Sequence, residues 1–168
     1  MAHMASLKQV WKSEPFTLDG LPAVALELTS ELGKVLRTEN GTLPRGVVAL
    51  QGEMGAGKTT LVQALCQSWG VVDSAVSPTF GLVQCYERGA ERVFHLDLYR
   101  LRDESEAWDL GLTEYFDADA LSFVEWPEQA PGLLPTDSVL LQVQVLGMQH
   151  EGMRQLILST PVQKHAVM

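Results

Sequence analysis

A glycine-rich segment in the first half of the chain constrains the fold more than any other feature. It matches the pattern G-x-x-x-x-G-K-[ST] at every fixed position and consists of Gly52, Glu53, Met54, Gly55, Ala56, Gly57, Lys58 and Thr59. The continuous apolar run 47–50 precedes it, and the apolar residues of 58–69 follow at helical spacing. A tight turn from a buried strand into a helix is the context in which this pattern binds phosphate, so the sequence predicts a phosphate-binding loop.

The residue types of this segment suit the binding of a nucleotide. Glycines let the backbone turn sharply and aim successive N–H groups inward, and the helix adds the positive end of its dipole. We expect Lys58 to reach the β- and γ-phosphates and the Thr59 hydroxyl to bind Mg²⁺, with Thr60 completing the nucleotide-binding segment. Asn40 is the only asparagine, so the N-K-x-D segment with which GTPases read guanine is absent. The expected nucleotide is therefore ATP or ADP.

Helical and strand-like patterns alternate along the rest of the chain. Apolar residues fall at three- and four-residue spacing from Leu21 to Arg37, and the acidic segment 103–109 is expected to form an exposed helix. Strands are predicted within 7–17, 47–50, 80–87, 92–99, 121–124, 139–146 and 154–159. This interleaving predicts an α/β class with a mixed sheet, in a single domain over residues 1–168.

Two acidic residues are candidates for the second group that holds Mg²⁺ in proteins of this kind. Asp97 lies in an alternating apolar run, whereas Glu125 ends the apolar run 121–124. The position of Glu125 looks more like the tip of a buried strand, but the spacing leaves both residues open. His95 is either a base or a hydrogen-bonded structural histidine.

Two further residues beside these acids have more than one interpretation. Thr79, in the Ser-Pro-Thr-Phe segment 77–80, is placed either to approach the γ-phosphate or Mg²⁺ or to cap an ordinary turn. Trp126 directly follows Glu125 and is a packed core residue, a lid over the nucleotide or a partner contact.

Charge and composition exclude several classes of protein. Lys and Arg number 12 against 21 Asp and Glu, giving a net charge of −9, which argues against a free-standing nucleic-acid binder.

No apolar run approaches the roughly 20 residues of a membrane helix, and no secretion signal is recognisable, so we expect a cytoplasmic protein. Residues 1–4 look like a cloning remnant and about 161–168 like a loose tail.

Several segments together resemble one protein family, the TsaE (YjeE) family of bacterial tRNA modification. The resemblance runs from about Thr29 to Pro135 and rests on the order of short motifs more than on the phosphate loop alone. These motifs are residues 52–59, Ser-Pro-Thr-Phe at 77–80, His-Leu-Asp-Leu-Tyr-Arg at 95–100, Gly-Leu at 111–112 and Val-Glu-Trp-Pro-Glu at 124–128.

The resemblance implies a three-layer P-loop NTPase fold with a mixed, mostly parallel sheet. It implies binding of ATP and Mg²⁺ and slow ATP hydrolysis that resets a TsaB–TsaD complex, which transfers the threonylcarbamoyl group to adenosine 37 of ANN-decoding tRNAs. In this reading Lys58, Asp97, Glu125 and Thr79 are catalytic, Thr59, Glu125 and Asp97 face the metal, and Trp126 lies beside the nucleotide. The protein would then contact tRNA only indirectly, and neither DNA nor a membrane. Arg154 receives no assigned role.

Two alternative functions would use the same phosphate-binding loop. A small-molecule kinase would pass the γ-phosphoryl group to a metabolite, but such enzymes usually carry several clustered arginines, and here only Arg100 and Arg102 cluster. A nucleotide-gated interaction module would use ATP binding alone to order the 77–80 segment.

Overall fold

The computed structural model describes residues 6–75 and 77–162. The predicted cloning remnant at residues 1–4 and residues 163–168 of the predicted tail lie outside this range. Pro161, predicted as the start of the loose tail, instead ends strand β8 (Arg154–Pro161). It pairs there with Leu7 of the edge strand β1 (Leu7–Lys12), so the sheet extends further toward the C-terminus than we predicted.

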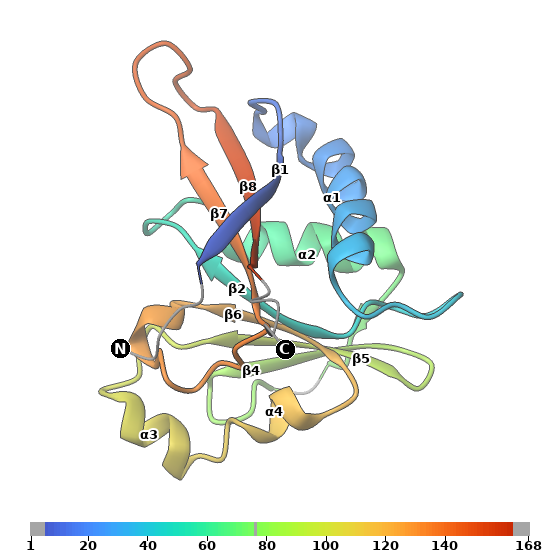
Figure 1. Cartoon of the computed structure of the whole chain (residues 1–168), viewed down its shortest axis with the longest axis vertical. Coiled ribbons are helices and arrows are strands. Elements are labelled where there is room, and N and C mark those ends of the chain that lie inside the picture. The colour runs from blue at the N-terminus through green and yellow to red at the C-terminus, as the bar shows by residue number, and fades with distance from the viewer. Residues whose placement is uncertain (1–5, 76, 163–168) are drawn as a thin grey trace, which may run out of the picture.

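One sheet of eight strands organises the described chain, in the order β1–β8–β7–β2–β6–β5–β4–β3 (Figure 1). Its four central strands are parallel, whereas antiparallel pairs form both margins. The central strands are β7 (Val139–Val145), β2 (Gly46–Gln51), β6 (Leu121–Glu125) and β5 (Glu91–Asp97), and the remaining two are β4 (Val83–Arg88) and β3 (Val72–Asp73). The predicted mixed α/β fold is confirmed.

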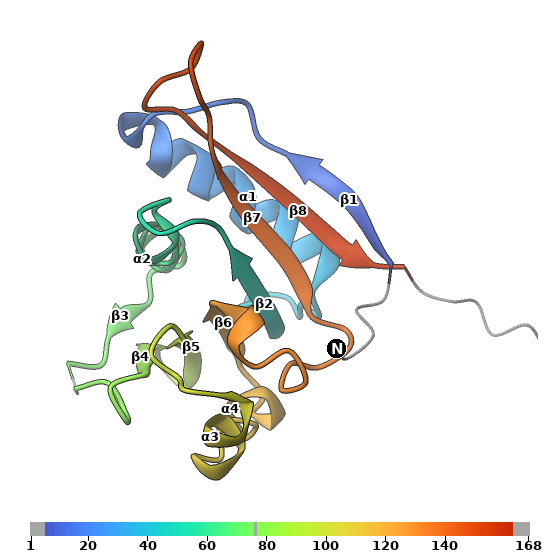
Figure 2. The same cartoon turned by 90° about the vertical axis from the view of Figure 1, so that its left-hand side faces the viewer.

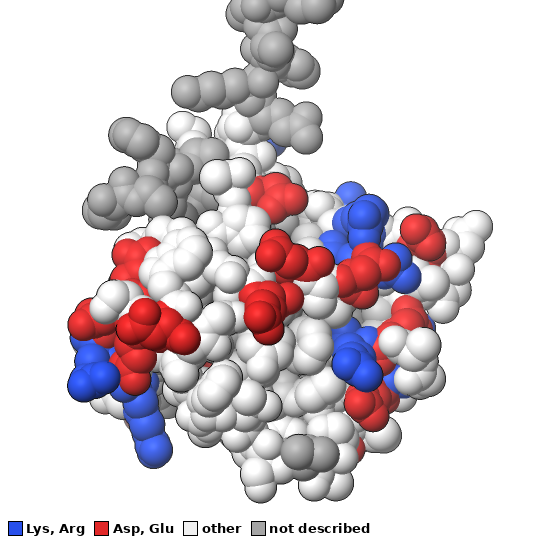
Figure 3. All heavy atoms as spheres, turned by 90° about the horizontal axis from the view of Figure 1, so that it is seen from below, with Lys and Arg blue, Asp and Glu red and all other residues white. Residues whose placement is uncertain are grey.

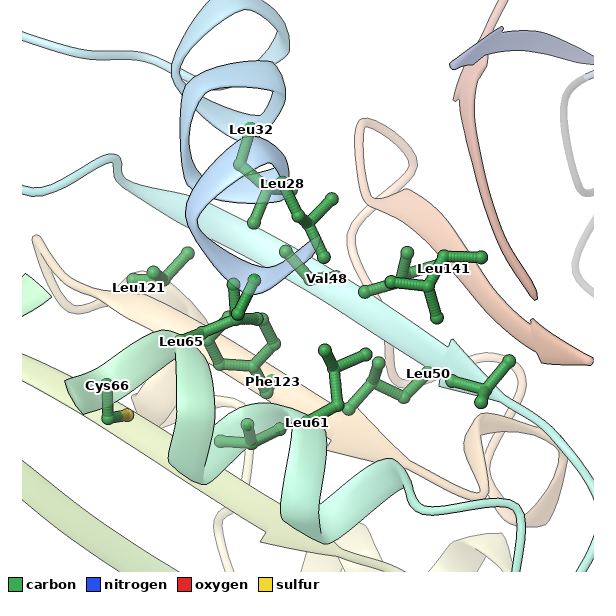
Figure 4. Packing of buried hydrophobic residues seen from close by; sticks show 14 of the residues in the cluster. Leu28, Leu32, Val48, Leu50, Leu61, Leu65, Cys66, Leu121, Phe123 and Leu141 are labelled. Carbon is green, nitrogen blue, oxygen red and sulfur yellow. The ribbon is translucent and has the colours of Figure 1, made fainter. Parts of the chain in front are cut away.

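Two long helices cover one face of the sheet. Helix α1 (Leu21–Val35) follows the short 3-10 turn η1 (Leu18–Gly20), and α2 (Lys58–Trp69) begins at the lysine of the glycine-rich segment. Their apolar stripes pack on alternate residues of the strands, because successive strand side chains point to opposite faces. Figure 4 shows this core, to which α1 contributes Leu28, α2 contributes Leu61 and Leu65, and β6 contributes Phe123.

Shorter elements cover the other face and complete three layers (Figure 1). They are α3 (Glu104–Asp109), α4 (Glu114–Asp117) and the 3-10 turn η2 (Pro127–Gln129). Val47, Leu96 and Val124 point from β2, β5 and β6 into a second apolar cluster, where Ala107 and Leu112 are fully buried. The acidic helix predicted at 103–109 is confirmed, and Asp103 caps it by accepting a hydrogen bond from the Glu106 N–H at 3.0 Å.

The hairpin predicted from 80–87 and 92–99 is present, but its first strand begins at Val83 rather than at residue 80. A turn occupies the preceding residues, since the N–H of Gly81 bonds the Pro78 carbonyl and that of Leu82 bonds the Thr79 carbonyl. Phe80 adopts a left-handed φ of 55° in this turn, which takes it out of any strand. Strand β3 and helix α4 were not predicted, because each is too short to show a periodic pattern.

The carboxyl ends of the central parallel strands meet at one edge of the sheet. There β2 runs into the glycine-rich segment, β6 ends at Glu125 and β5 ends at Asp97, which is the Cα partner of Glu125. The β7–β8 hairpin continues past this edge, as Figure 2 shows. Of the helices that the structure describes, none combines the length and the apolar character needed to span a bilayer.

Candidate functional site

The glycine-rich segment turns directly from β2 into α2, as predicted. Gly57 immediately precedes α2 with a left-handed φ of 100°, a conformation that side chains strongly disfavour. A Cβ at Gly52 would lie 2.9 Å from the Val143 carbonyl oxygen on β7, so only glycine fits there. The first N–H groups of α2 receive no side-chain cap, which leaves the positive end of the helix available to an anion.

A pocket of about 340 Å³ opens in front of this turn. Nine of its lining residues were predicted as site residues from the sequence, and Tyr99 is the tenth. The lining consists of Met54, Gly55, Gly57, Lys58, Thr59, Thr60, Asp97, Tyr99, Glu125 and Trp126. The predicted residues Gly52, Glu53, Ala56 and Thr79 are not part of the lining.

Lys58 is a buried cation at the floor of this pocket, only 5% exposed. Its Nζ donates a hydrogen bond to the Gly52 carbonyl at 2.5 Å and lies 3.7 Å from the centre of the Trp126 ring. Within the described chain no carboxylate comes within 4.0 Å of this ammonium group. This ammonium group contacts a carbonyl oxygen and an aromatic face directly, while the charge of Glu125 acts on it from beyond 4.0 Å. A buried cation without a carboxylate in direct contact is poised for an anionic ligand.

Glu125 is the buried carboxylate of the site and bonds two side chains through one oxygen. Its Oε2 accepts a hydrogen bond from the Thr59 hydroxyl at 2.8 Å and lies 2.5 Å from His95 Nε2. Burial alone raises the pKa of Glu125, but the bond and charge of His95, the Thr59 hydroxyl and the charge of Lys58 outweigh it. The net pKa lies below the ordinary value, so Glu125 is ionised at neutral pH.

Asp97 lies on the next strand with a different environment. Its carboxylate is exposed on the pocket wall and accepts a hydrogen bond from the Tyr99 N–H at 3.1 Å. The register pairs Asp97 with Glu125, so both candidate acids line one pocket. One is buried and bonded to the loop threonine, whereas the other is open to solvent.

An aromatic pair forms part of the pocket wall. The rings of Tyr99 and Trp126 lie 5.1 Å apart, and Trp126 adopts a left-handed φ of 57° directly after β6. Non-glycine residues seldom adopt this conformation, and they cluster at functional sites. No role was predicted for Tyr99; the available signal was its place in the motif 95–100, two residues after Asp97.

Thr79 lies apart from these residues. Its side chain is exposed, and its N–H bonds the Val83 carbonyl at 2.9 Å in the turn that precedes β4. His95, in contrast, is only 7% exposed and contacts Glu125 directly. Of the two interpretations of His95 from sequence, the geometry supports the hydrogen-bonded one.

Comparison with known proteins identifies the family. The family model for "Threonylcarbamoyl adenosine biosynthesis protein TsaE" matches residues 23–156, which include every site residue described above. This chain belongs to the TsaE family. The structure also resembles the crystal structure of YdiB from Bacillus subtilis, with a TM-score of 0.65 and 22% identity over 96% of this chain and 90% of that one. This likeness supports the fold.

Curated relatives of the TsaE family are named "tRNA threonylcarbamoyladenosine biosynthesis protein TsaE". The Haemophilus influenzae relative is 38% identical over 58% of this chain and 61% of its own length. The Bacillus subtilis relative is 36% identical over 62% of this chain and 65% of its own length. The Synechocystis relative is 40% identical over 64% of this chain and 69% of its own length. The chain thus spans less than two thirds of the first two relatives.

Proposed function

We propose that this chain binds and hydrolyses ATP as an accessory subunit of the cytoplasmic machinery that makes threonylcarbamoyladenosine in tRNA. The observation that carries the proposal is the buried Lys58 ammonium, which faces the pocket from the glycine-rich segment and has no carboxylate within 4.0 Å among the described residues. A triphosphate supplies the negative charge that this group lacks. Family membership supports the link to tRNA modification.

The oxygen atoms around Thr59 fit a magnesium ion. Mg²⁺ prefers hard oxygen ligands and is usually held by one or two carboxylates together with phosphate oxygens. Thr59 and Glu125 place a hydroxyl and an ionised carboxylate 2.8 Å apart beside the loop, and Asp97 adds a second carboxylate to the same pocket. When bound, the ion would neutralise charge on the phosphates. We assign binding of Mg²⁺ to Thr59 and Glu125, and we assign to Asp97 the role of orienting the water that attacks ATP.

The proposed partner is a protein complex of the TsaB–TsaD type rather than tRNA itself. Figure 3 shows Asp and Glu side chains gathered over the middle of the face seen from below, with Lys and Arg nearer its margins. A phosphate backbone would be repelled by such a surface, and the net charge of −9 acts in the same direction. Contact with tRNA through a protein partner is consistent with both observations.

The decisive test measures ATP hydrolysis by the purified protein, alone and with a TsaB–TsaD pair from the same organism. We expect slow turnover alone and stimulation of about tenfold or more by the pair, because a partner can complete a catalytic site that is open on one side. Tight ATP binding without stimulation would contradict the proposal and favour a nucleotide-gated module. Turnover that instead requires a metabolite and yields a phosphorylated product would indicate a kinase.

Trp126 offers a direct signal of nucleotide binding. Its ring lies 3.7 Å from the Lys58 ammonium, which must turn toward any bound phosphate, so we expect its fluorescence to change when ATP and Mg²⁺ are added. Titration should give a saturable change that is absent in Trp126→Phe, since the other tryptophans do not line the pocket. An unchanged signal in a protein that binds ATP by calorimetry would show that this contact does not respond to nucleotide.

A further inference from the structure

Arg154 contacts the phosphate loop from the far end of the chain. Its Nε donates to the Ala56 carbonyl at 2.8 Å and Nη2 to the Gly55 carbonyl at 3.4 Å, while Nη1 bonds the Gly152 carbonyl at 3.3 Å. Among the described residues the guanidinium forms no ion pair with a carboxylate. The positively charged guanidinium group therefore donates hydrogen bonds to three backbone carbonyls, two of which belong to the loop.

The direction of these bonds matters because a peptide unit is planar. Its carbonyl and the next N–H point in opposite directions, so fixing the Ala56 carbonyl on Arg154 aims the Gly57 N–H away from Arg154. Gly57 lines the pocket, and its N–H is the first donor ahead of α2. The orientation of this donor is thus set by a side chain outside the pocket.

Arg154 is itself held firmly. It is the first residue of β8, and its backbone exchanges two hydrogen bonds with Phe16, at 2.8 and 2.9 Å. Phe16 is buried in the core, and the neighbouring strand β7 touches Gly52 through the Val143 carbonyl. The β7–β8 hairpin therefore supports the loop at Gly52, where the loop begins, and at Gly55 and Ala56 in its middle.

We propose that Arg154 is a positioning residue of the phosphate loop and that it sets the affinity for nucleoside di- and triphosphates by holding the loop amides in their binding orientation. The proposal rests on the proposed function in taking a nucleotide as the ligand. The alternative is that Arg154 contributes only a positive charge near the phosphates. Lysine separates the two, because it keeps the charge but lacks the planar fork that holds two adjacent carbonyls.

The first measurement uses nucleotide-free protein and so does not depend on ATP binding. Hydrogen exchange followed by NMR would report the Ala56 amide, which bonds the Glu53 carbonyl, and the Leu61 amide, which bonds the Gly57 carbonyl. In Arg154→Gln we expect both amides to exchange about tenfold faster, while amides of the β4–β5 hairpin are unchanged. The control Arg92→Gln removes the same charge from an exposed position on β5 and should leave the loop amides unchanged.

The second measurement is the affinity for ADP and ATP by calorimetry. We expect Arg154→Gln to weaken both by about tenfold to a hundredfold, and Arg154→Lys to lose most of the same affinity. Full affinity in Arg154→Lys would overturn the proposal in favour of charge alone, and unchanged exchange and affinity in Arg154→Gln would overturn it altogether. Faster exchange across the whole protein would assign Arg154 to general stability instead.

The outcomes also separate this proposal from the proposed function. If the wild-type protein binds no ATP, the proposed function fails whatever the loop amides do. If the wild-type protein binds ATP and Arg154→Gln binds it equally well, only the role of Arg154 is refuted.

Discussion

Replacing Lys58 with alanine is expected to lower ATP hydrolysis by about a hundredfold or more and to abolish tRNA modification in a reconstituted system at limiting ATP. The ammonium group is the buried cation of the pocket, and a donor aimed at developing phosphate charge acts with little screening in such a position. Phosphate release and formation of the modified nucleoside measure the two effects. Normal modification by this variant at limiting ATP would refute the assignment of the loop.

Two further variants make this result specific. Lys58→Met keeps an unbranched side chain against the Trp126 ring but removes the charge, so it should be as inactive as the alanine variant. Lys34→Ala removes an exposed ammonium group on α1 that pairs with Glu31, and it should leave hydrolysis unchanged. If Lys58→Met were active and Lys58→Ala were not, packing beneath Trp126 rather than charge would be the function of this residue.

The central elements of the fold could be predicted because each has a strong local signal. Helix α2 begins and ends where the sequence indicated. It ends at Trp69 because Gly70 follows in a left-handed conformation with a φ of 70°. The strand β6 was recognisable from its mostly apolar run, which reflects burial on both faces. The order of the strands was not predicted, because it depends on pairings between residues far apart in the chain, such as Val48 with Val139.

The residues of the site likewise divide into those with a local sequence signal and those brought together by distant pairings. The loop residues and the two acids were found because they lie in a motif or at the end of an apolar run. The contact between His95 and Glu125 joins residues 30 positions apart and follows from the parallel register of β5 and β6. Arg154 lies 98 positions from Ala56, so only the antiparallel β7–β8 hairpin brings it to the loop.

Glu125→Gln and Asp97→Asn are expected to affect different steps of ATP turnover, because the two acids differ in what they contact. Glu125 is ionised and bonds the Thr59 hydroxyl, whereas the exposed carboxylate of Asp97 bonds only the Tyr99 N–H among the described residues. We expect Glu125→Gln to raise the Mg²⁺ concentration needed for half-maximal hydrolysis by about tenfold to a hundredfold. Asp97→Asn should lower kcat by about a hundredfold with little change in that Mg²⁺ requirement.

Hydrolysis measured across a Mg²⁺ series, with ATP binding measured separately, distinguishes these outcomes. Asp117→Asn, at an exposed position on α4, serves as the control for loss of a carboxylate and should match the wild-type protein. A Mg²⁺ shift in Asp97→Asn and none in Glu125→Gln would reverse the two roles. If Asp97→Asn binds ATP without turning it over and tRNA modification still cycles, hydrolysis is not the function of this site, and binding alone must act on the partner.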